Sequence, residues 1–275
     1  PAEQTITSDR DEFEFIEVMN VSTNAIELTG VRFTAGILFN FPTGSALAPG
    51  ERVVVVRNKA AFAARYGNTP VGAGEYEGNL SNSGEEIGLT DATGQDIRRF
   101  QFLDRSPWPS SANMNGYSLV LQRPNSRPDH RDPNQWRASV RPGGSPGESD
   151  TSVFVGNPTA DANANGQADL LDYAFGAVLT DPITGVALSL ESRETNGQVT
   201  QYLVLTFPRN LAADDVVVTL ETAADLSGPW LARTGDFLLL RELRSAAGPV
   251  RQSFQMTAPT TAGSAFVRLS VSLAP

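Results

Sequence analysis

The sequence predicts an all-β protein made of two β-sandwich domains, with one short helix in each. Short runs of apolar and β-branched residues alternate with polar ones along most of the chain. The 24 Gly and 18 Pro residues divide these runs into strand-sized pieces. A stretch rich in Gly, Pro and Ser at 141–152 cannot build a core. We therefore expect domains at 1–147 and 161–275, joined by a linker at 148–160.

The first half of the chain reads mainly as strands. The segment RVVVV at 52–56 is a continuous β-branched run, typical of a strand buried on both faces. KAAFAARYG at 59–67 predicts a short helix that ends at its glycine. DATG at 91–94 predicts a hairpin turn between strands at 86–90 and 95–102. Further strands are expected at 13–18, 26–33 and 117–124, with Trp136 in a final irregular piece.

The second half opens with a helix and continues with strands. ADLLDYAFGAVL at 168–179 predicts a helix with a broad apolar face. Six strands follow, with turn signals about every ten residues, which indicates a second sandwich. They are expected at 186–193, 201–210, 215–223, 230–235, 250–258 and 266–274.

Several segments, in order, resemble a known family. They are DEFEFIEVMNVSTNAIELTGVRFT, FPTGSALAPGERVVVV, LSNSGEEIGLTDATGQ, SPWP at 106–109 and DPNQWRAS. On these segments, residues 11–147 resemble the lamin-tail domain of the bacterial type. The resemblance implies an immunoglobulin-like β-sandwich for the first domain.

One strand that usually begins a domain of this family is missing from the matching part of the sequence. Such domains usually begin with a strand upstream of DEFEFIE, and here only Thr5–Thr7 is placed to form it. The chain also begins with Pro1 and not Met, so we expect a processed product or a piece of something longer. Either the strand has been removed, or another chain donates it to an open sheet edge. The second alternative makes self-association through that edge, as in a filament subunit, a hypothesis.

The second half resembles a C-terminal module of large exported bacterial proteins, in particular from Verrucomicrobia and Planctomycetes. The matching pieces are DANANGQADLLDYAFG and YLVLTFPRNLAADDVVVTLETAADLSGPW. Together the two resemblances imply a bacterial protein that is secreted or displayed on the cell surface.

The run DANANGQADLLD at 161–172 predicts a calcium site. Calcium takes six to eight oxygen ligands, and an EF-hand loop supplies them from positions 1, 3, 5, 7, 9 and 12, with Gly at position 6. Gly166 occupies the glycine position. The predicted ligands are Asp161, Asn163, Asn165, the Gln167 carbonyl, Asp169 and Asp172, which closes the loop as in dockerins. With only three carboxylates and no entering helix, we expect one weakly bound, structural ion.

The same run is compatible with a site that binds no metal. Asn and Asp side chains in such a run can hold the backbone by Asx turns and cap the following helix. Both interpretations remain open from the sequence.

Composition excludes several kinds of chemistry. The chain has no Cys, so disulfides, thiolate metal sites and a Cys nucleophile are excluded. Its single histidine, His130, lies among five arginines (123, 127, 131, 137 and 141), either as an anion site or as a solvated loop of paired charges. We expect the second. A net charge of −10 disfavours nucleic acid, and no apolar run is long enough for membrane insertion.

No motif points to an enzyme, so we expect a non-catalytic structural or adhesion module. No Gly-x-Ser-x-Gly, Walker or dinucleotide-binding glycine motif is present. The expected partner is a protein or a glycan surface, and calcium is expected to stiffen the interdomain junction. Trp108, flanked by two prolines, is expected to be exposed, where it would contact a sugar ring. The alternative is therefore a carbohydrate-binding accessory region of a secreted hydrolase.

Overall fold

The computed structural model describes residues 9–67, 73–112, 116–176, 185–244, 249–259 and 266–275. The chain forms two compact units. The first contains Pro1–Asp104 and Ser111–Asp150, and the second contains Arg105–Ser110 and Thr151–Pro275. The passage between Asp150 and Thr151 lies inside the predicted linker 148–160. The predicted edge strand at Thr5–Thr7 lies outside the described residues.

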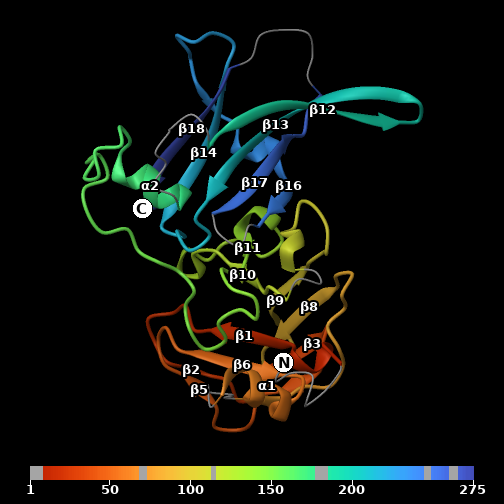
Figure 1. The fold of residues 1–275 in the computed structure, drawn as a ribbon. Coiled ribbons are helices and arrows are strands. Elements are labelled where there is room, and N and C mark those ends of the chain that lie inside the picture. The colour runs from red at the N-terminus through yellow and green to blue at the C-terminus, as the bar shows by residue number, and fades with distance from the viewer. Residues whose placement is uncertain (1–8, 68–72, 113–115, 177–184, 245–248, 260–265) are drawn as a thin grey trace. The chain divides into compact units, whose positions relative to one another are not determined.

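The first unit is a β-sandwich with several small sheets (Figure 1). One sheet has the order β1-β6-β7, where β7 is parallel to β6, and the larger sheet has the order β4-β3-β8-β9. Two small pairs, β2-β5 and β10-β11, complete it. The elements are β1 Phe15–Met19, β2 Ile26–Glu27, β3 Arg32–Ala35, β4 Phe39–Asn40, β5 Ala46–Leu47, β6 Arg52–Val56, α1 Lys59–Tyr66, β7 Gly74–Glu75, β8 Glu86–Thr90, β9 Asp96–Gln101, β10 Leu119–Leu121 and β11 Trp136–Ala138.

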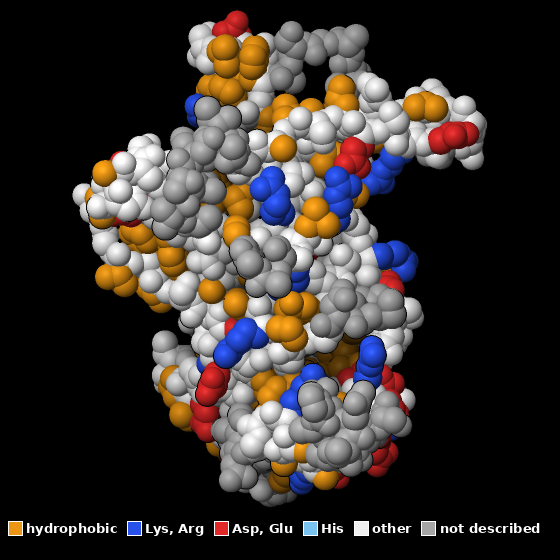
Figure 2. Space-filling view, viewed as in Figure 1, with side chains coloured by type: hydrophobic (Ala, Val, Ile, Leu, Met, Phe, Trp, Pro, Cys, Tyr) orange, Lys and Arg blue, Asp and Glu red, His pale blue; other side chains and the backbone are white. Residues whose placement is uncertain are grey.

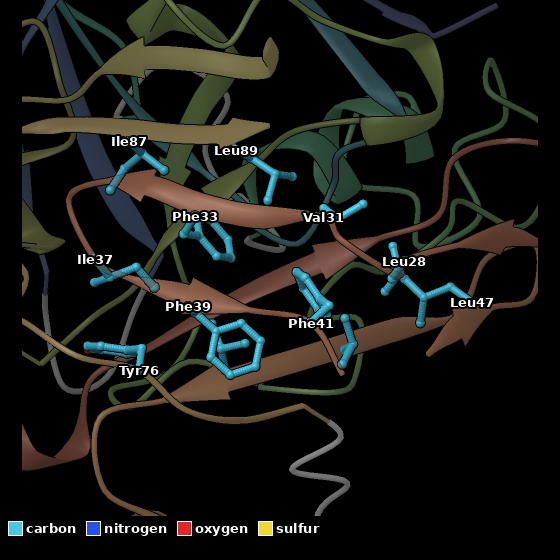
Figure 3. Close-up of a cluster of buried hydrophobic side chains, with 12 residues drawn as sticks. Leu28, Val31, Phe33, Ile37, Phe39, Phe41, Leu47, Tyr76, Ile87 and Leu89 are labelled. Atoms are coloured by element: carbon cyan, nitrogen blue, oxygen red, sulfur yellow. The ribbon is translucent and has the colours of Figure 1, made fainter. Parts of the chain in front are cut away.

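The core of this unit lies between its sheets, and β6 lies at its centre. All four valines of β6 are buried, which confirms the prediction of a strand covered on both faces. Phe39, Phe33 and Leu89 come from neighbouring strands of one sheet, β4, β3 and β8, and lie with Phe41 in the same cluster (Figure 3). On the other face of β6, Val54 and Val56 pack with Phe62 of α1.

Helix α1 begins and ends where the sequence predicts. The side chain of Asn58 caps its first turn by accepting hydrogen bonds from the amides of Ala60 and Ala61. Gly67, with φ of 69°, ends it. The predicted hairpin is also confirmed, as β8 and β9. Trp136, in contrast, is not in an irregular piece, because it begins β11 and pairs with Leu121 of β10.

The second unit is a sandwich of two antiparallel sheets, preceded by helix α2, Asp169–Phe175. Its sheets have the orders β12-β13-β17-β16 and β15-β14-β18. A seventh strand, β16, was not predicted. The strands are β12 Ala187–Thr195, β13 Gln198–Arg209, β14 Val216–Ala223, β15 Leu231–Ala232, β16 Phe237–Leu243, β17 Val250–Met256 and β18 Phe266–Leu273.

The core of the second unit joins α2 to both sheets. Leu170, Ala174 and Phe175 of α2 pack in one buried cluster with Phe207 of β13 and Leu220 of β14. The helix ends at Gly176, which adopts φ of 68°. The expected continuation of the helix to residue 179 lies outside the described residues. The described part of the chain contains no helix with the length and hydropathy to cross a membrane.

Candidate metal centre

The predicted calcium loop folds into a tight turn that leads into α2. Both carboxylate oxygens of Asp161 accept backbone hydrogen bonds, from Asn165 at 3.0 Å and from Gly166 at 2.9 Å. Gly166 has φ of 85°, and Ala164 has φ of 57°, a region that favours glycine. Asp161, at the first position of the loop, therefore holds the backbone at the middle of the loop.

Three of the predicted ligands converge at the end of the loop. The side-chain amide of Asn163 donates to the Asp172 carboxylate at 2.8 Å, and that of Asn165 donates to both of its oxygens at 3.0 and 3.1 Å. These contacts span nine and seven residues of sequence. Asx turns alone need only bonds between residues two to four apart, so the turn is closed by more than local bonding.

Two predicted ligands have other roles in the loop. Oδ1 of Asp169 accepts from the backbone of Ala162 at 2.9 Å, and the amide of Asp169 donates to Ala160 at 2.6 Å. Gln167 is buried, and its backbone donates to Oδ1 of Asn165 at 2.8 Å. The residue at the N-cap of α2 is Ala168, which makes no side-chain cap bond. The Asx turns of the metal-free interpretation are therefore present, while its helix cap is absent.

The oxygens that the loop offers to a metal ion are of three kinds: carboxylate, side-chain amide and backbone carbonyl. Within the described ranges, no three Asp, Glu or His side chains gather closely enough to hold a metal ion. A calcium ion here would depend on the amide oxygens of Asn163 and Asn165 and on the Gln167 carbonyl, besides the carboxylates. Since the Asn163 and Asn165 amides now donate to Asp172, an ion would have to displace those contacts.

A second set of polar contacts fastens the chain before the loop. The Tyr173 hydroxyl on α2 donates to Asp215 at 2.8 Å and lies 3.0 Å from the Ser152 hydroxyl. The other oxygen of Asp215 accepts from the backbone of Phe154 at 2.7 Å. Burial and the neighbouring Asp215 raise the pKa of Tyr173 to about 12, so the phenol stays a donor at neutral pH. Sequence inspection did not find this cluster, because its members are far apart in sequence and belong to no motif.

The histidine loop contains one exposed, local ion pair, whereas Arg137 is buried and paired outside the loop, so the expectation of a solvated loop holds only in part. Asp129 and Arg131 form an exposed ion pair at 3.0 Å. His130 is half-buried beside Phe100 and Trp136, and this burial lowers its pKa below the usual value. Arg137 is paired with Asp150 at 2.5 Å, with both side chains almost fully buried.

The expectation that Trp108 is exposed is wrong. Its side chain is only 4% exposed, and Pro109 beside it is fully buried. The segment is held in place because the amide of Trp108 donates to the Arg105 carbonyl and the Ser106 hydroxyl donates to Leu239 of β16 at 2.6 Å. A tryptophan offers a large apolar area, and its burial outweighs the effect of the flanking prolines. It therefore offers no free ring face for a sugar.

The fold is an all-β protein of two sandwiches, the first immunoglobulin-like. Residues 3–104 match the family model of the Lamin Tail Domain, so this part of the chain is similar to that family. The match ends at Asp104, before β10 and β11. Neither a search of curated proteins nor a search of solved structures finds a match.

Proposed function

We propose that this chain is a non-catalytic structural or adhesion part of an extracellular or cell-surface protein, stiffened by calcium next to the passage between its two units. The observation that carries the proposal is the convergence of Asn163, Asn165 and Asp172, with Asp161 holding the turn. These are positions 3, 5, 12 and 1 of an EF-hand-type loop. The ion would be held by Asp161, Asn163, Asn165, the Gln167 carbonyl, Asp169 and Asp172.

The affinity expected for this loop suits an extracellular setting. Three carboxylates are few for calcium, and two amides already bind Asp172. Extracellular calcium modules work at Kd values of about 10⁻⁴–10⁻³ M. The resemblance of the second unit to C-terminal modules of exported bacterial proteins supports the same location.

The ion would hold the C-terminal end of the segment 152–161, whose N-terminal end is already held by hydrogen bonds. Ser152 donates its amide to Ala212 at 2.8 Å, and Phe154 donates to Asp215. Between Phe154 and the loop, Val155 is 89% exposed, and Asn157 and Thr159 are also exposed. Calcium bound at Asp161 and Asp172 would restrict this segment from its far end. One EF-hand-type loop that is not paired with a second such loop is suited to a structural role of this kind.

Limited proteolysis with and without a chelator tests the proposal. Calcium at about 1 mM, a concentration in the expected extracellular range, should slow cleavage at 155–168, and chelator should restore it. Asp161→Ala should be cut rapidly in both conditions. Asp225→Asn serves as the matched control, because Asp225 also forms an exposed Asx turn, with Ser227. Digestion of the wild type that does not respond to calcium would overturn the proposal.

The carbohydrate-binding alternative predicted a role for Trp108. Because that side chain is buried, we expect no binding of the wild type on a glycan array. Glycan binding by the wild type would favour the alternative.

A further inference from the structure

The hairpin formed by β12 and β13 extends beyond its sheet. The two strands pair along Ala187–Thr195 and Gln198–Thr206, whereas β17 pairs only with Val204–Arg209 of β13. Residues 190–195 and 198–203 therefore form a two-stranded arm (Figure 1). Asn196 and Gly197 join the strands with φ of 53° and 77°, as a type I′ turn requires. A hairpin of two strands is marginally stable by itself, so a third strand would stabilise the arm.

Strand β12 is the outer strand of its sheet, and apart from its charged side chains it lacks the usual protection of a sheet edge. It is nine residues long, and its register with β13 runs without a bulge. It contains neither Pro nor Lys. The outer strand at the opposite edge, β16, does have a bulge, between Leu239 and Arg241. A long, regular outer strand presents backbone donors and acceptors that another strand can pair with.

The side chains of the arm divide into two faces. On one face Leu190 and Val199 are 53% and 64% exposed. On the other face Glu191 and Arg193 stand two residues apart on β12, and Arg193 lies 5.9 Å from the Tyr202 ring. Arg241 of β16 pairs with Glu191 at 2.5 Å. Figure 2 shows hydrophobic and acidic side chains on the part of the arm that extends from the sandwich.

We propose that β12 pairs antiparallel with β12 of a second copy of this chain, with Ser192 opposite Ser192. In this register Glu191 of each copy lies opposite Arg193 of the other, so two further ion pairs form on one face, beside the pair that each Glu191 makes with Arg241. Pairing would run over Ser189–Thr195, and the two arms would form a four-stranded sheet in the order β13-β12-β12-β13.

Charge complementarity selects this register and this partner. Opposite charges directly across an antiparallel pair stabilise it, and like charges destabilise it. A register centred on Glu191 would place that carboxylate opposite itself. A register centred on Ser189 would pair fewer residues of β12 and place Glu191 opposite Ala187. The order Glu191, Ser192, Arg193 is complementary to itself when the strand meets its own copy in reverse direction.

Because the chain has no Cys, a single introduced cysteine reports the register directly. Directly opposed residues of an antiparallel pair have Cα atoms about 4.5–5.5 Å apart, which suits a disulfide. Ser192→Cys should form disulfide-linked dimers under mild oxidation. Ser189→Cys should not, because position 189 faces Thr195 of the second copy. Dimers from Ser189→Cys and not from Ser192→Cys, or from neither, would overturn the proposal.

Charge exchange provides the second test, read by light scattering of the full chain after size-exclusion chromatography. Arg193→Glu and Glu191→Arg should each weaken the dimer roughly tenfold or more, since each places like charges opposite one another twice. The double variant Glu191→Arg/Arg193→Glu should restore it. A wild type that remains monomeric at high concentration, or a double variant without rescue, would contradict the pairing. Chelator should change none of these results, so they are distinguishable from those of the calcium test.

Discussion

The hydroxyl of Tyr173 on α2 donates a 2.8 Å hydrogen bond to Asp215, which directly precedes β14. The second oxygen of that carboxylate accepts the backbone amide of Phe154 at 2.7 Å. One carboxylate therefore holds both the helix that follows the predicted calcium loop and the segment that precedes that loop. These contacts join both parts to the sandwich.

Tyr173→Phe should loosen this attachment. A hydrogen bond to a charged group contributes about 1.5–3 kcal/mol, so the variant should lose stability of that order. Hydrogen exchange of the α2 amides and urea unfolding measure the effect. Tyr202→Phe is the matched control, because its ring lies on the projecting arm and away from this cluster. Equal effects of the two substitutions would contradict the assigned role.

Replacing one partner of the buried ion pair between Arg137 and Asp150 should strongly lower the stability of the fold. Their side chains are 3% and 5% exposed, so Asp150→Asn leaves a buried guanidinium without its counter-charge. Such a loss typically costs about 3–5 kcal/mol. The exposed pair of Asp129 and Arg131 gives the control, and Asp129→Asn should cause no measurable change. Calorimetry of the two variants checks the difference.

This pair also predicts how stability changes in acid. Burial alone would raise the pKa of Asp150, but Arg137 more than offsets it, so the pKa lies below its usual value. A carboxyl with a lowered folded pKa adds stability above its unfolded pKa of about 3.9, and that stability is lost as the pH falls through the folded value. Melting temperatures between pH 6 and pH 2 should fall less steeply in Asp150→Asn than in the wild type.

Glu14 predicts the opposite dependence in the first unit. Burial raises its pKa to about 7, against the hydrogen bond that it accepts from the Leu80 amide at 3.0 Å. A carboxyl with a raised folded pKa favours the folded state at low pH, and this contribution is lost as the pH rises from about 4.5 through 7. Glu14→Gln should therefore melt roughly 2–8 °C higher than the wild type at pH 8, and the difference should shrink at pH 5. An unchanged pH slope in the variant would contradict this assignment.

Position 84 requires glycine for two reasons, its positive φ and the lack of space for a Cβ atom. It has φ of 93°, and a Cβ there would overlap the Phe102 carbonyl and the backbone of Leu103. Gly84→Ala should cost about 1–3 kcal/mol or more, since strain and a backbone clash add. Gly50 has φ of 76° with open space around it, so Gly50→Ala should cost less. Chemical denaturation gives the loss of stability in each variant, and the difference between the two losses is the contribution of the clash at position 84.

Local patterns in the sequence predicted the elements that depend on local chemistry. Asn58 and Gly67 set the bounds of α1, and the alternation along β18 places Val267, Leu269 and Val271 against the core. Strand β16 was missed although turn residues precede it at 234–236, because its apolar start FLLL lacks the alternation that distinguishes a strand from a buried helix segment. Its assignment depends on pairing with β17, which follows it in sequence.

The candidate site shows the same limit. The order of oxygen-bearing residues predicts which side chains line the loop, and Asn163, Asn165 and Asp172 do come together. The contact between Tyr173 and Asp215 spans 42 residues, and Trp108 is buried although its neighbours are prolines. Both depend on how distant segments pack, which the spacing of residues along one segment does not encode.

Isothermal titration of calcium into the full chain measures whether the loop at 161–172 binds the ion. We predict that one ion binds per chain with a Kd of about 10⁻⁴–10⁻³ M, and that this binding is lost in Asp172→Ala and kept in Asp225→Asn. Asn165→Asp should bind more tightly, because it adds a carboxylate and removes an amide donor to Asp172. No heat of binding from the wild type or from Asn165→Asp, at calcium concentrations up to several times that Kd, would contradict the claim.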